Sequence, residues 1–109
     1  MIDQKSVEED LSNLEGVTKD YPYGRATAVY RVGDTMFALL DEGTMPVRLS
    51  LRCDPQLSSL LRQKYETVMP AHNLDKQIWN TLILSGQLNR DELKDLIRHA
   101  YELGRVSDK

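Results

Sequence analysis

The sequence predicts a two-layer α+β sandwich, in which an antiparallel β-sheet has helices packed on one face. Helical patterns lie near the start, middle and end of the chain, and short strand-like runs lie between them. The connections between the first three runs are short, which favours an antiparallel meander. At 109 residues the chain has room for one domain, expected over residues 1–109. The expected element order is α-β-β-β-α-β-β-α.

The first helix is expected to begin at Ser6, because Ser6 and Glu9 can form a capping box. Gly16 suits the left-handed residue that ends a helix. The apolar side chains between them, at helical spacing, are Val7, Leu11 and Leu14. A turn over residues 21–24 then leads into the strands.

Three strands are expected before the middle helix. Residues 26–32 and 35–40 form the first two, joined at Gly33-Asp34, which is a two-residue hairpin signal. In the third strand Val47, Leu49 and Leu51 alternate with Arg48, Ser50 and Arg52. A period of two gives one buried face and one wet face, so this strand presents a basic face to solvent.

The second half of the chain is expected to hold two helices and one or two strands. Asp54-Pro55 is a strong helix start, and Tyr65 is expected to close that helix. Residues 66–69 can form a short strand, and the last strand is expected over residues 76–84. Asn89 with Glu92 marks the start of the final helix, which Gly104 can end.

Charge and cysteine content limit the function classes. The net charge is −3, which argues against a strongly electrostatic nucleic-acid binder. Residues 1–24 carry two basic and six acidic side chains, whereas residues 48–80 carry five basic and three acidic ones. A lone Cys53, the absence of a leader and a longest apolar stretch of only five residues, 36–40, predict a cytoplasmic protein with no membrane segment.

Sequence motifs for catalysis are absent. The chain has no phosphate-binding glycine loop, no cysteine pair, no His-Glu-x-x-His helix and no Gly-x-Ser-x-Gly elbow. A Cys53-His72 nucleophile pair is conceivable, but no third group is evident to orient it, and a buried structural thiol is favoured for Cys53. We therefore expect a protein that is not an enzyme and needs no cofactor or metal.

Three groups of residues are candidates for binding. Arg48 and Arg52 share one strand face, about 13 Å apart, and with Lys76 they could contact phosphates. An ordinary solvated sheet face and helix rim is nevertheless the favoured interpretation of the basic residues in this region. Trp79 could stack on a base, although a core tryptophan is favoured. The acidic residues of the first helix could hold a cation or simply face solvent.

Several strings in the chain resemble the MmcQ/YjbR family of small bacterial proteins, which has a frataxin-like (CyaY-like) fold. They are Tyr21-Pro22-Tyr23-Gly24, Met36-Phe37-Ala38-Leu39, Leu49-x-Leu51-Arg52-Cys53-Asp54-Pro55, Trp79-Asn80-Thr81 after Lys76, and Leu93-x-x-Leu96-Ile97-x-His99-Ala100-Tyr101. The resemblance implies an antiparallel sheet with helices on one face, and it implies the DNA-binding role commonly given to the family. Lys76, Trp79 and Asn80 match its motif positions, whereas Asp75 and the low net charge depart from it.

The leading hypothesis is therefore a non-enzymatic binding module that meets double-stranded DNA through its sheet face, using Arg48, Arg52, Lys76, Trp79 and Asn80. The alternative is a frataxin-like module that contacts another protein or handles a metal through its acidic first helix.

Overall fold

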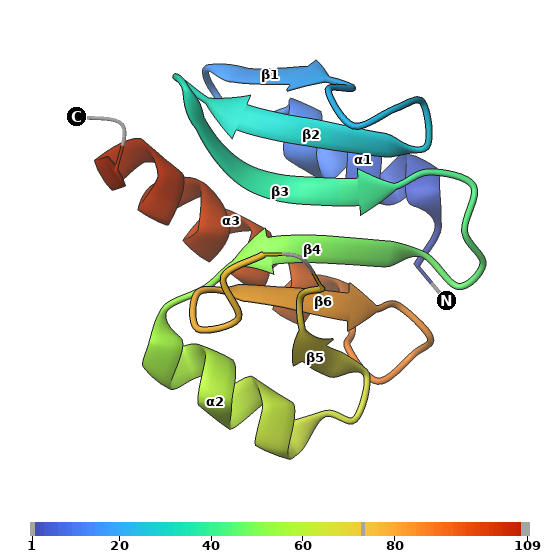
Figure 1. The fold of residues 1–109 in the computed structure, drawn as a ribbon. Helices are drawn as coiled ribbons and strands as arrows, with labels where there is room; N and C mark the ends of the chain where they lie inside the picture. The colour runs from blue at the N-terminus through green and yellow to red at the C-terminus, as the bar shows by residue number, and fades with distance from the viewer. Residues whose placement is uncertain (1, 73, 108–109) are drawn as a thin grey trace.

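The computed structural model describes residues 2–72 and 74–107. In this part of the chain a six-stranded antiparallel sheet, in the order β1-β2-β3-β4-β6-β5, packs against helices (Figure 1). The elements are α1 (Gln4–Ser12), β1 (Val17–Asp20), β2 (Thr27–Val32), β3 (Thr35–Asp41), β4 (Arg48–Arg52), α2 (Pro55–Lys64), β5 (Val68–Pro70), β6 (Trp79–Ile83) and α3 (Arg90–Ser107). The predicted α+β class and antiparallel sheet are confirmed.

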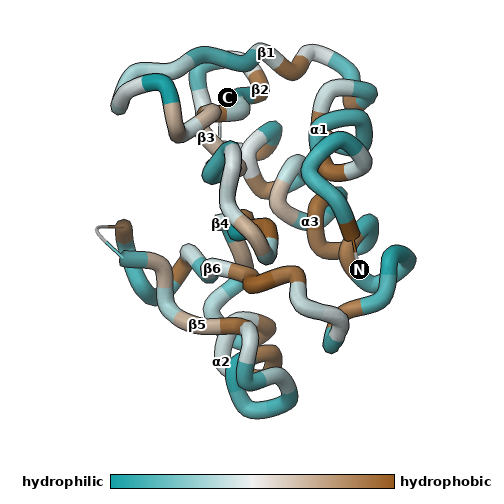
Figure 2. The backbone as a smooth tube through the Cα atoms, turned by 90° about the vertical axis from the view of Figure 1, so that its right-hand side faces the viewer, coloured by the Kyte–Doolittle hydropathy of each residue, from teal (hydrophilic) through white to brown (hydrophobic). Residues whose placement is uncertain are grey.

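The helices leave one face of the sheet open. Helix α3 packs against β2, β3 and β4, α1 packs against β1 and α3, and α2 contacts β5 at the sheet edge. Seen from the side, α1 and α3 lie together on one side of the sheet (Figure 2). On the other side, two loops project from the sheet, one between β1 and β2 and one between β5 and β6. We call this side the open face.

The alternation in β4 explains the two faces. Leu49 and Leu51 are buried in the helix-covered core, and Arg48 and Arg52 lie on the opposite face with Ser50 between them. The neighbouring strands continue this division, because Leu49 pairs with Leu40 on β3 and with Leu82 on β6, all of them buried. The predicted buried and wet sides of this strand are confirmed.

Gly104 does not end the last helix, as the sequence suggested, because α3 continues to Ser107. The residue instead allows the helix to approach the sheet closely. A Cβ at this position would lie 2.8 Å from Val32 Cγ1 and 3.2 Å from Phe37 Cβ. Phe37 is fully buried here and packs edge-on against Tyr101 of α3, with ring centroids 5.8 Å apart.

Strand β1 was not predicted, so the element order contains one strand more than expected. Its residues after Val17 are exposed, and it has no alternation of apolar and polar side chains to mark it in the sequence. It pairs with β2 as an edge strand. The last strand is also shorter than predicted, since residues 76–78 belong to the preceding loop.

The helix starts are partly as predicted. The first helix begins at Gln4 rather than Ser6, because Asp3 Oδ1 accepts a hydrogen bond from the Ser6 N–H at 2.9 Å and caps it. Asp54 caps α2, and Tyr65 ends it, as expected. Asn89 and Glu92 form a reciprocal capping box at the start of α3, with bonds of 2.8 and 3.2 Å.

Within residues 2–72 and 74–107, none of the helices has both the length and the apolar character needed to cross a membrane.

Candidate functional site

The open face contains a groove between its two projecting loops. The groove has a volume of about 470 Å³, within the range of roughly 300–1,000 Å³ that is typical of ligand sites. Tyr23, from the loop before β2, lies on one side, and His72 and Leu74, from the loop before β6, lie on the other. The remaining lining residues belong to the four strands between them and form the floor: Thr27, Leu39, Asp41, Arg48, Ser50 and Thr81.

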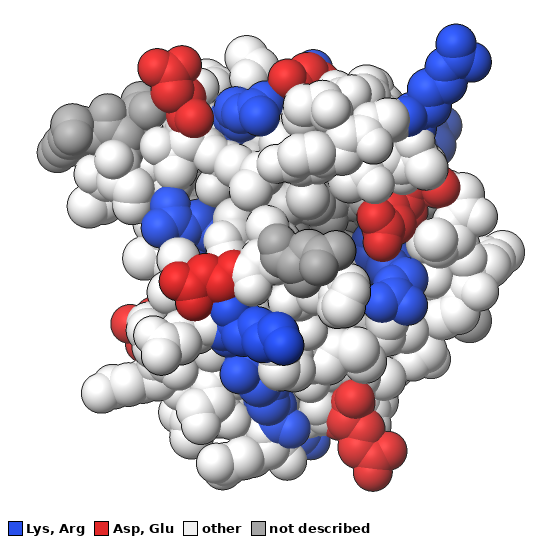
Figure 3. Space-filling view, viewed as in Figure 1, with Lys and Arg blue, Asp and Glu red and all other residues white. Residues whose placement is uncertain are grey.

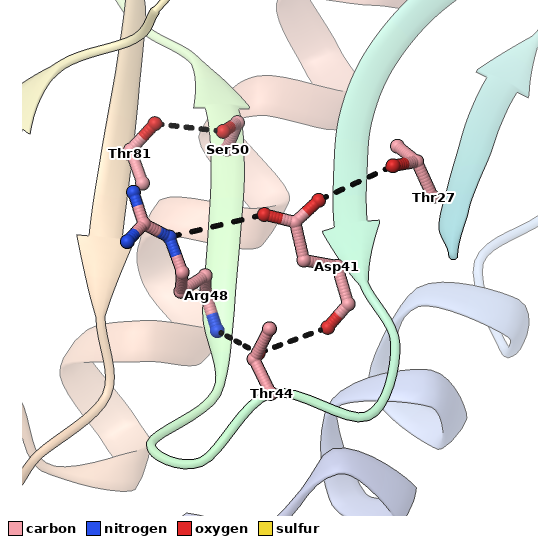
Figure 4. A network of polar contacts seen from close by, with 6 residues as sticks. All are labelled: Thr27, Asp41, Thr44, Arg48, Ser50 and Thr81. Atoms are coloured by element: carbon pink, nitrogen blue, oxygen red, sulfur yellow. Dashed lines mark hydrogen bonds and ion pairs between the residues drawn. The ribbon is translucent and has the colours of Figure 1, made fainter. Parts of the chain in front are cut away.

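Hydrogen bonds and one ion pair connect much of the floor across the strands (Figure 4). Asp41 lies at the centre: its Oδ1 accepts a hydrogen bond from Thr27 Oγ1 at 3.4 Å, and its Oδ2 lies 3.8 Å from Arg48 Nε. Further along β4, Ser50 Oγ and Thr81 Oγ1 share a hydrogen bond of 2.8 Å. The floor thus offers a carboxylate, a guanidinium and hydroxyls to a ligand.

The loop after β3 fixes the position of Arg48 at the rim of this network. Thr44 Oγ1 donates to the Asp41 carbonyl at 3.1 Å and accepts from the Arg48 N–H at 3.2 Å (Figure 4). These bonds tie the end of β3 to the start of β4. The Arg48 side chain remains 46% exposed in spite of its ion pair.

A short turn positions Tyr23 on its wall. The Gly24 N–H donates to the Tyr21 carbonyl at 3.3 Å, and the Tyr21 hydroxyl donates to Glu42 at 2.8 Å. Tyr21 is therefore held against the sheet edge, whereas the Tyr23 side chain is 65% exposed and has no hydrogen bond among the described residues. Tyr23 therefore presents an accessible aromatic ring to the groove.

Arg62 of α2 holds the opposite wall. Its Nε donates to Asn80 Oδ1 at 2.7 Å, and its Nη2 donates to the carbonyls of Lys76 and Trp79. Asn80 in turn donates to Ser58 Oγ at 3.0 Å, so a buried polar network connects α2 to β6. The network fixes the end of the loop that carries His72 and Leu74. Arg62 is therefore a structural residue, because its guanidinium is engaged by Asn80 and by two backbone carbonyls.

The structure separates the predicted binding residues into two groups. Arg48, Arg52 and Lys76 have accessible side chains, and both arginines lie on the open face. Trp79 is only 5% exposed and Asn80 only 1%. The expected contacts of these two residues with nucleic acid are therefore corrected: burial prevents Trp79 from stacking on a base, and Asn80 is engaged by Arg62 and Ser58. The favoured interpretation of Trp79 as a core residue is confirmed.

Arg52 differs from Arg48 and Arg31 in its side-chain partners. Arg48 is paired with Asp41, and Arg31 is paired with Asp20. Arg52 is half-buried, and within the described chain its side chain has no hydrogen bond or ion pair. Figure 3 shows this side of the molecule with basic and acidic side chains interspersed rather than gathered by sign.

The conceivable Cys53-His72 pair finds no support in the geometry. Cys53 is 4% exposed among Leu51, Leu61 and Leu82 on the helix side, whereas His72 lines the groove of the open face. Burial raises the pKa of the Cys53 thiol, which disfavours the reactive thiolate. The expected buried thiol is confirmed.

The acidic first helix uses two of its carboxylates in ion pairs. Glu8 lies 3.8 Å from Lys19 Nζ, and Asp10 lies 3.1 Å from an Arg90 nitrogen. Among the residues that the structure describes, no group of three or more His, Cys, Asp or Glu side chains is arranged to hold a metal ion.

Sequence reasoning missed most of the groove. Ser50 could have been added, because it lies between Arg48 and Arg52 on the same strand face. Asp41 and Thr81 join the floor only through strand pairing, and Tyr23 and His72 come from loops 49 residues apart in the sequence. No local pattern predicts that these residues meet.

Comparison with known proteins identifies the family. The YjbR family model matches residues 12–103. The chain is 33% identical over 78 residues to the uncharacterized protein YjbR of Escherichia coli K12, covering 72% of this chain and 65% of that protein, slightly less than two thirds of its length. It is 28% identical over 106 residues to the uncharacterized protein YbdF of Escherichia coli O157:H7, covering 94% of this chain and 87% of that relative.

Solved structures agree with this assignment. A Deinococcus radiodurans protein with a DUF419 domain has a TM-score of 0.86 and 31% identity, with 91% of this chain and 75% of that one covered. A Pseudomonas syringae protein has a TM-score of 0.81 and 25% identity, with 95% and 100% covered. By its sequence, and in agreement with these folds, the chain belongs to the YjbR family.

Proposed function

We propose that this protein is a non-enzymatic binding module whose open face binds nucleic acid. Arg48, Arg52 and Lys76 supply the contacts to phosphate. The observation that carries the proposal is Arg52, a half-buried arginine whose side chain has no carboxylate partner among the described residues. A partly desolvated charge is unfavourable unless it is paired, and a phosphate oxygen is a suitable partner for arginine.

Two further observations support this choice of face. Arg52 pairs in register with Trp79, and Lys76 lies three residues before Trp79 on the loop that Arg62 holds. Arg48 lies on the same strand face as Arg52, four residues away, with its side chain 46% exposed. Arg48 and Arg52 therefore share the open face, and Lys76 lies on the loop that leads into β6 beside Arg52, whereas helix α1 lies on the other side of the sheet (Figure 2).

Fluorescence anisotropy with labelled oligonucleotides, at about 50 and 200 mM salt, tests the proposal. Binding through phosphates releases counterions, so affinity must fall between the two salt concentrations. Removing both Arg48 and Arg52 by substitution with Ala should weaken binding and reduce the slope of log K against log salt by up to about two units.

A matched control is available on the helix side. Arg98 and Arg105 are exposed residues of α3, both paired with Glu102, and replacing both with Ala changes the net charge by the same amount. We expect this control to keep nearly all of the binding. If both double variants lose affinity equally, only net charge matters and the open face is not the site. If the unmodified protein binds neither single strands nor duplex at the lower salt, the proposal is wrong, and a protein partner of α1 becomes the question to test.

A further inference from the structure

We propose that the groove of the open face accommodates one unpaired nucleobase, so that the preferred ligand is a single strand rather than a duplex. This inference rests on the proposed function and specifies its ligand. It begins with the shape of the site. The groove floor crosses β2, β3, β4 and β6, which is three strand spacings, or about 14 Å.

A groove of this width lies between two raised walls, and a double helix is too wide to reach its floor. In a duplex the bases are also stacked on one another, so that only their edges are accessible in the grooves. An unpaired base on a flexible strand can turn out of the stack and enter a narrow site. Recognition of single strands typically places such bases against aromatic side chains.

Each wall provides a surface on which a base can stack. Tyr23 is 65% exposed, and none of the described residues forms a hydrogen bond that would hold its ring away from a ligand. His72 is exposed on the other wall, next to the half-buried Leu74. A base that enters the groove can stack on the Tyr23 ring at one wall or lie against His72 and Leu74 at the other.

The floor provides partners for the polar edge of a base. Asp41 accepts hydrogen bonds and Arg48 donates them, and the two groups lie side by side at 3.8 Å. The hydroxyls of Ser50 and Thr81 share only one hydrogen bond with each other, so each keeps further capacity to accept. Base edges carry both donors and acceptors, which fits a floor of mixed character.

Arg52 and Lys76 are then placed to bind phosphates of the same oligonucleotide. Arg52 lies two residues after the groove residue Ser50 on the same strand face, and Lys76 lies two residues after the groove residue Leu74. A strand that inserts one base into the groove can therefore place its neighbouring phosphates near both cations. In this arrangement phosphate contacts supply salt-dependent affinity, and the groove supplies selectivity for a strand with exposed bases.

The test compares three probes of equal length by anisotropy at about 50 mM salt: an oligothymidylate, an oligomer of abasic sites, and a duplex. We expect the oligothymidylate to bind about tenfold or more tightly than the other two, because stacking and edge contacts are lost without an accessible base. Tyr23→Ala should reduce its affinity to that of the abasic oligomer, whereas Tyr23→Trp should retain tight binding. Leu60→Ala is the control, since Leu60 is an exposed apolar residue of α2, 62% accessible, that does not line the groove.

The outcomes separate the two proposals. If the abasic oligomer binds as tightly as the oligothymidylate, and both respond to salt, then phosphate binding stands and the base site is wrong. Tighter binding of the duplex would also overturn the base site. Binding of none of the three probes would overturn both proposals. Circular dichroism of Tyr23→Ala establishes that any loss comes from the ring and not from unfolding.

Discussion

The two faces of the sheet differ in what their side chains contact. On the helix-covered face, Leu40, Leu49 and Leu82 are almost fully buried against one another and the helices. On the open face, the adjacent residues of the same strands form a polar floor that is largely connected by hydrogen bonds and an ion pair. Because side chains alternate between the two faces of a strand, one face of the sheet packs in the core and stabilises the fold, and the other face is available for binding. The following predictions test this division.

The largest expected difference in stability is between substitutions of two adjacent leucines of β3 that lie on opposite faces of the sheet. Leu40 is fully buried, so Leu40→Ala should lower the free energy of unfolding by about 2–5 kcal/mol. Leu39 is half-buried in the groove floor, and Leu39→Ala should cost about 1 kcal/mol. Urea denaturation of both variants measures the difference. Equal losses would mean that the open face is packed as tightly as the covered one.

A smaller loss of stability is expected from Arg62, which connects α2 to β6 and to the loop before it. Arg62→Met removes the hydrogen bonds to Asn80 and to two backbone carbonyls, and leaves a buried amide oxygen without that donor. We expect a loss of about 1–3 kcal/mol in unfolding free energy. Lys64→Met is the control, because Lys64 is exposed near the end of the same helix. If the two substitutions have the same effect, Arg62 does not hold the groove wall.

The dependence of stability on pH should come from the helix side. Hydrogen bonds lower the pKa of Asp3 and Glu92, the former from Ser6 and the latter from Tyr65. A carboxylate with a lowered pKa stabilises the fold at neutral pH, and this stabilisation is lost as the pH falls below about 4. Asp3→Asn and Glu92→Gln should each flatten the acid limb of a plot of stability against pH, and an unchanged limb would contradict the assignment.

At alkaline pH the dependence is the opposite one, because the fold loses stability as the pH rises. Burial raises the pKa of Cys53 and of Tyr30, so both groups stay protonated in the fold at a pH where the unfolded chain loses their protons. The stability that they contribute is present below about pH 9 and is lost as the pH rises through their folded pKa values. Tyr30→Phe and Cys53→Ser, measured by thermal unfolding between pH 7 and 11, should each reduce this alkaline loss. A loss identical to that of the unmodified protein would show that other groups cause it.

The smallest effect concerns the reactivity of Cys53. Its burial and its raised pKa predict alkylation by iodoacetamide at least about tenfold slower in the folded protein than in urea. Mass spectrometry of timed samples measures both rates. Rapid labelling of the folded protein would show that the helix side opens near Cys53.

The sequence predicted the helix-covered face better than the open one, for a physical reason. The alternation from Val47 to Arg52 and the caps at Asp54 and Asn89 are local signals, so they could be recognised without the fold. Strand β1 carries no such signal, because only Val17 is partly buried. Gly104 was misinterpreted as a helix end, since its close approach to Val32 and Phe37 depends on tertiary packing.

The candidate site was predictable only in part. Strand periodicity placed Arg48 and Arg52 on one face, and the structure confirms that placement. Trp79 and Asn80 match family motif positions, but they are buried. The groove itself depends on two loops from distant parts of the sequence, which the sheet brings to the same side (Figure 2). Such a site follows from strand order and register rather than from any single motif.

The most direct test of the account is a chemical-shift titration of the isotope-labelled protein with oligothymidylate, followed in ¹H–¹⁵N spectra. We predict that the perturbed backbone amides cluster at Tyr23, Arg48, Ser50, His72 and Thr81, and that those on the exposed surfaces of α1 and α3 stay unchanged. Perturbations confined to α1 or α3, or none at saturating oligonucleotide, would contradict the claim that the open face is the binding surface.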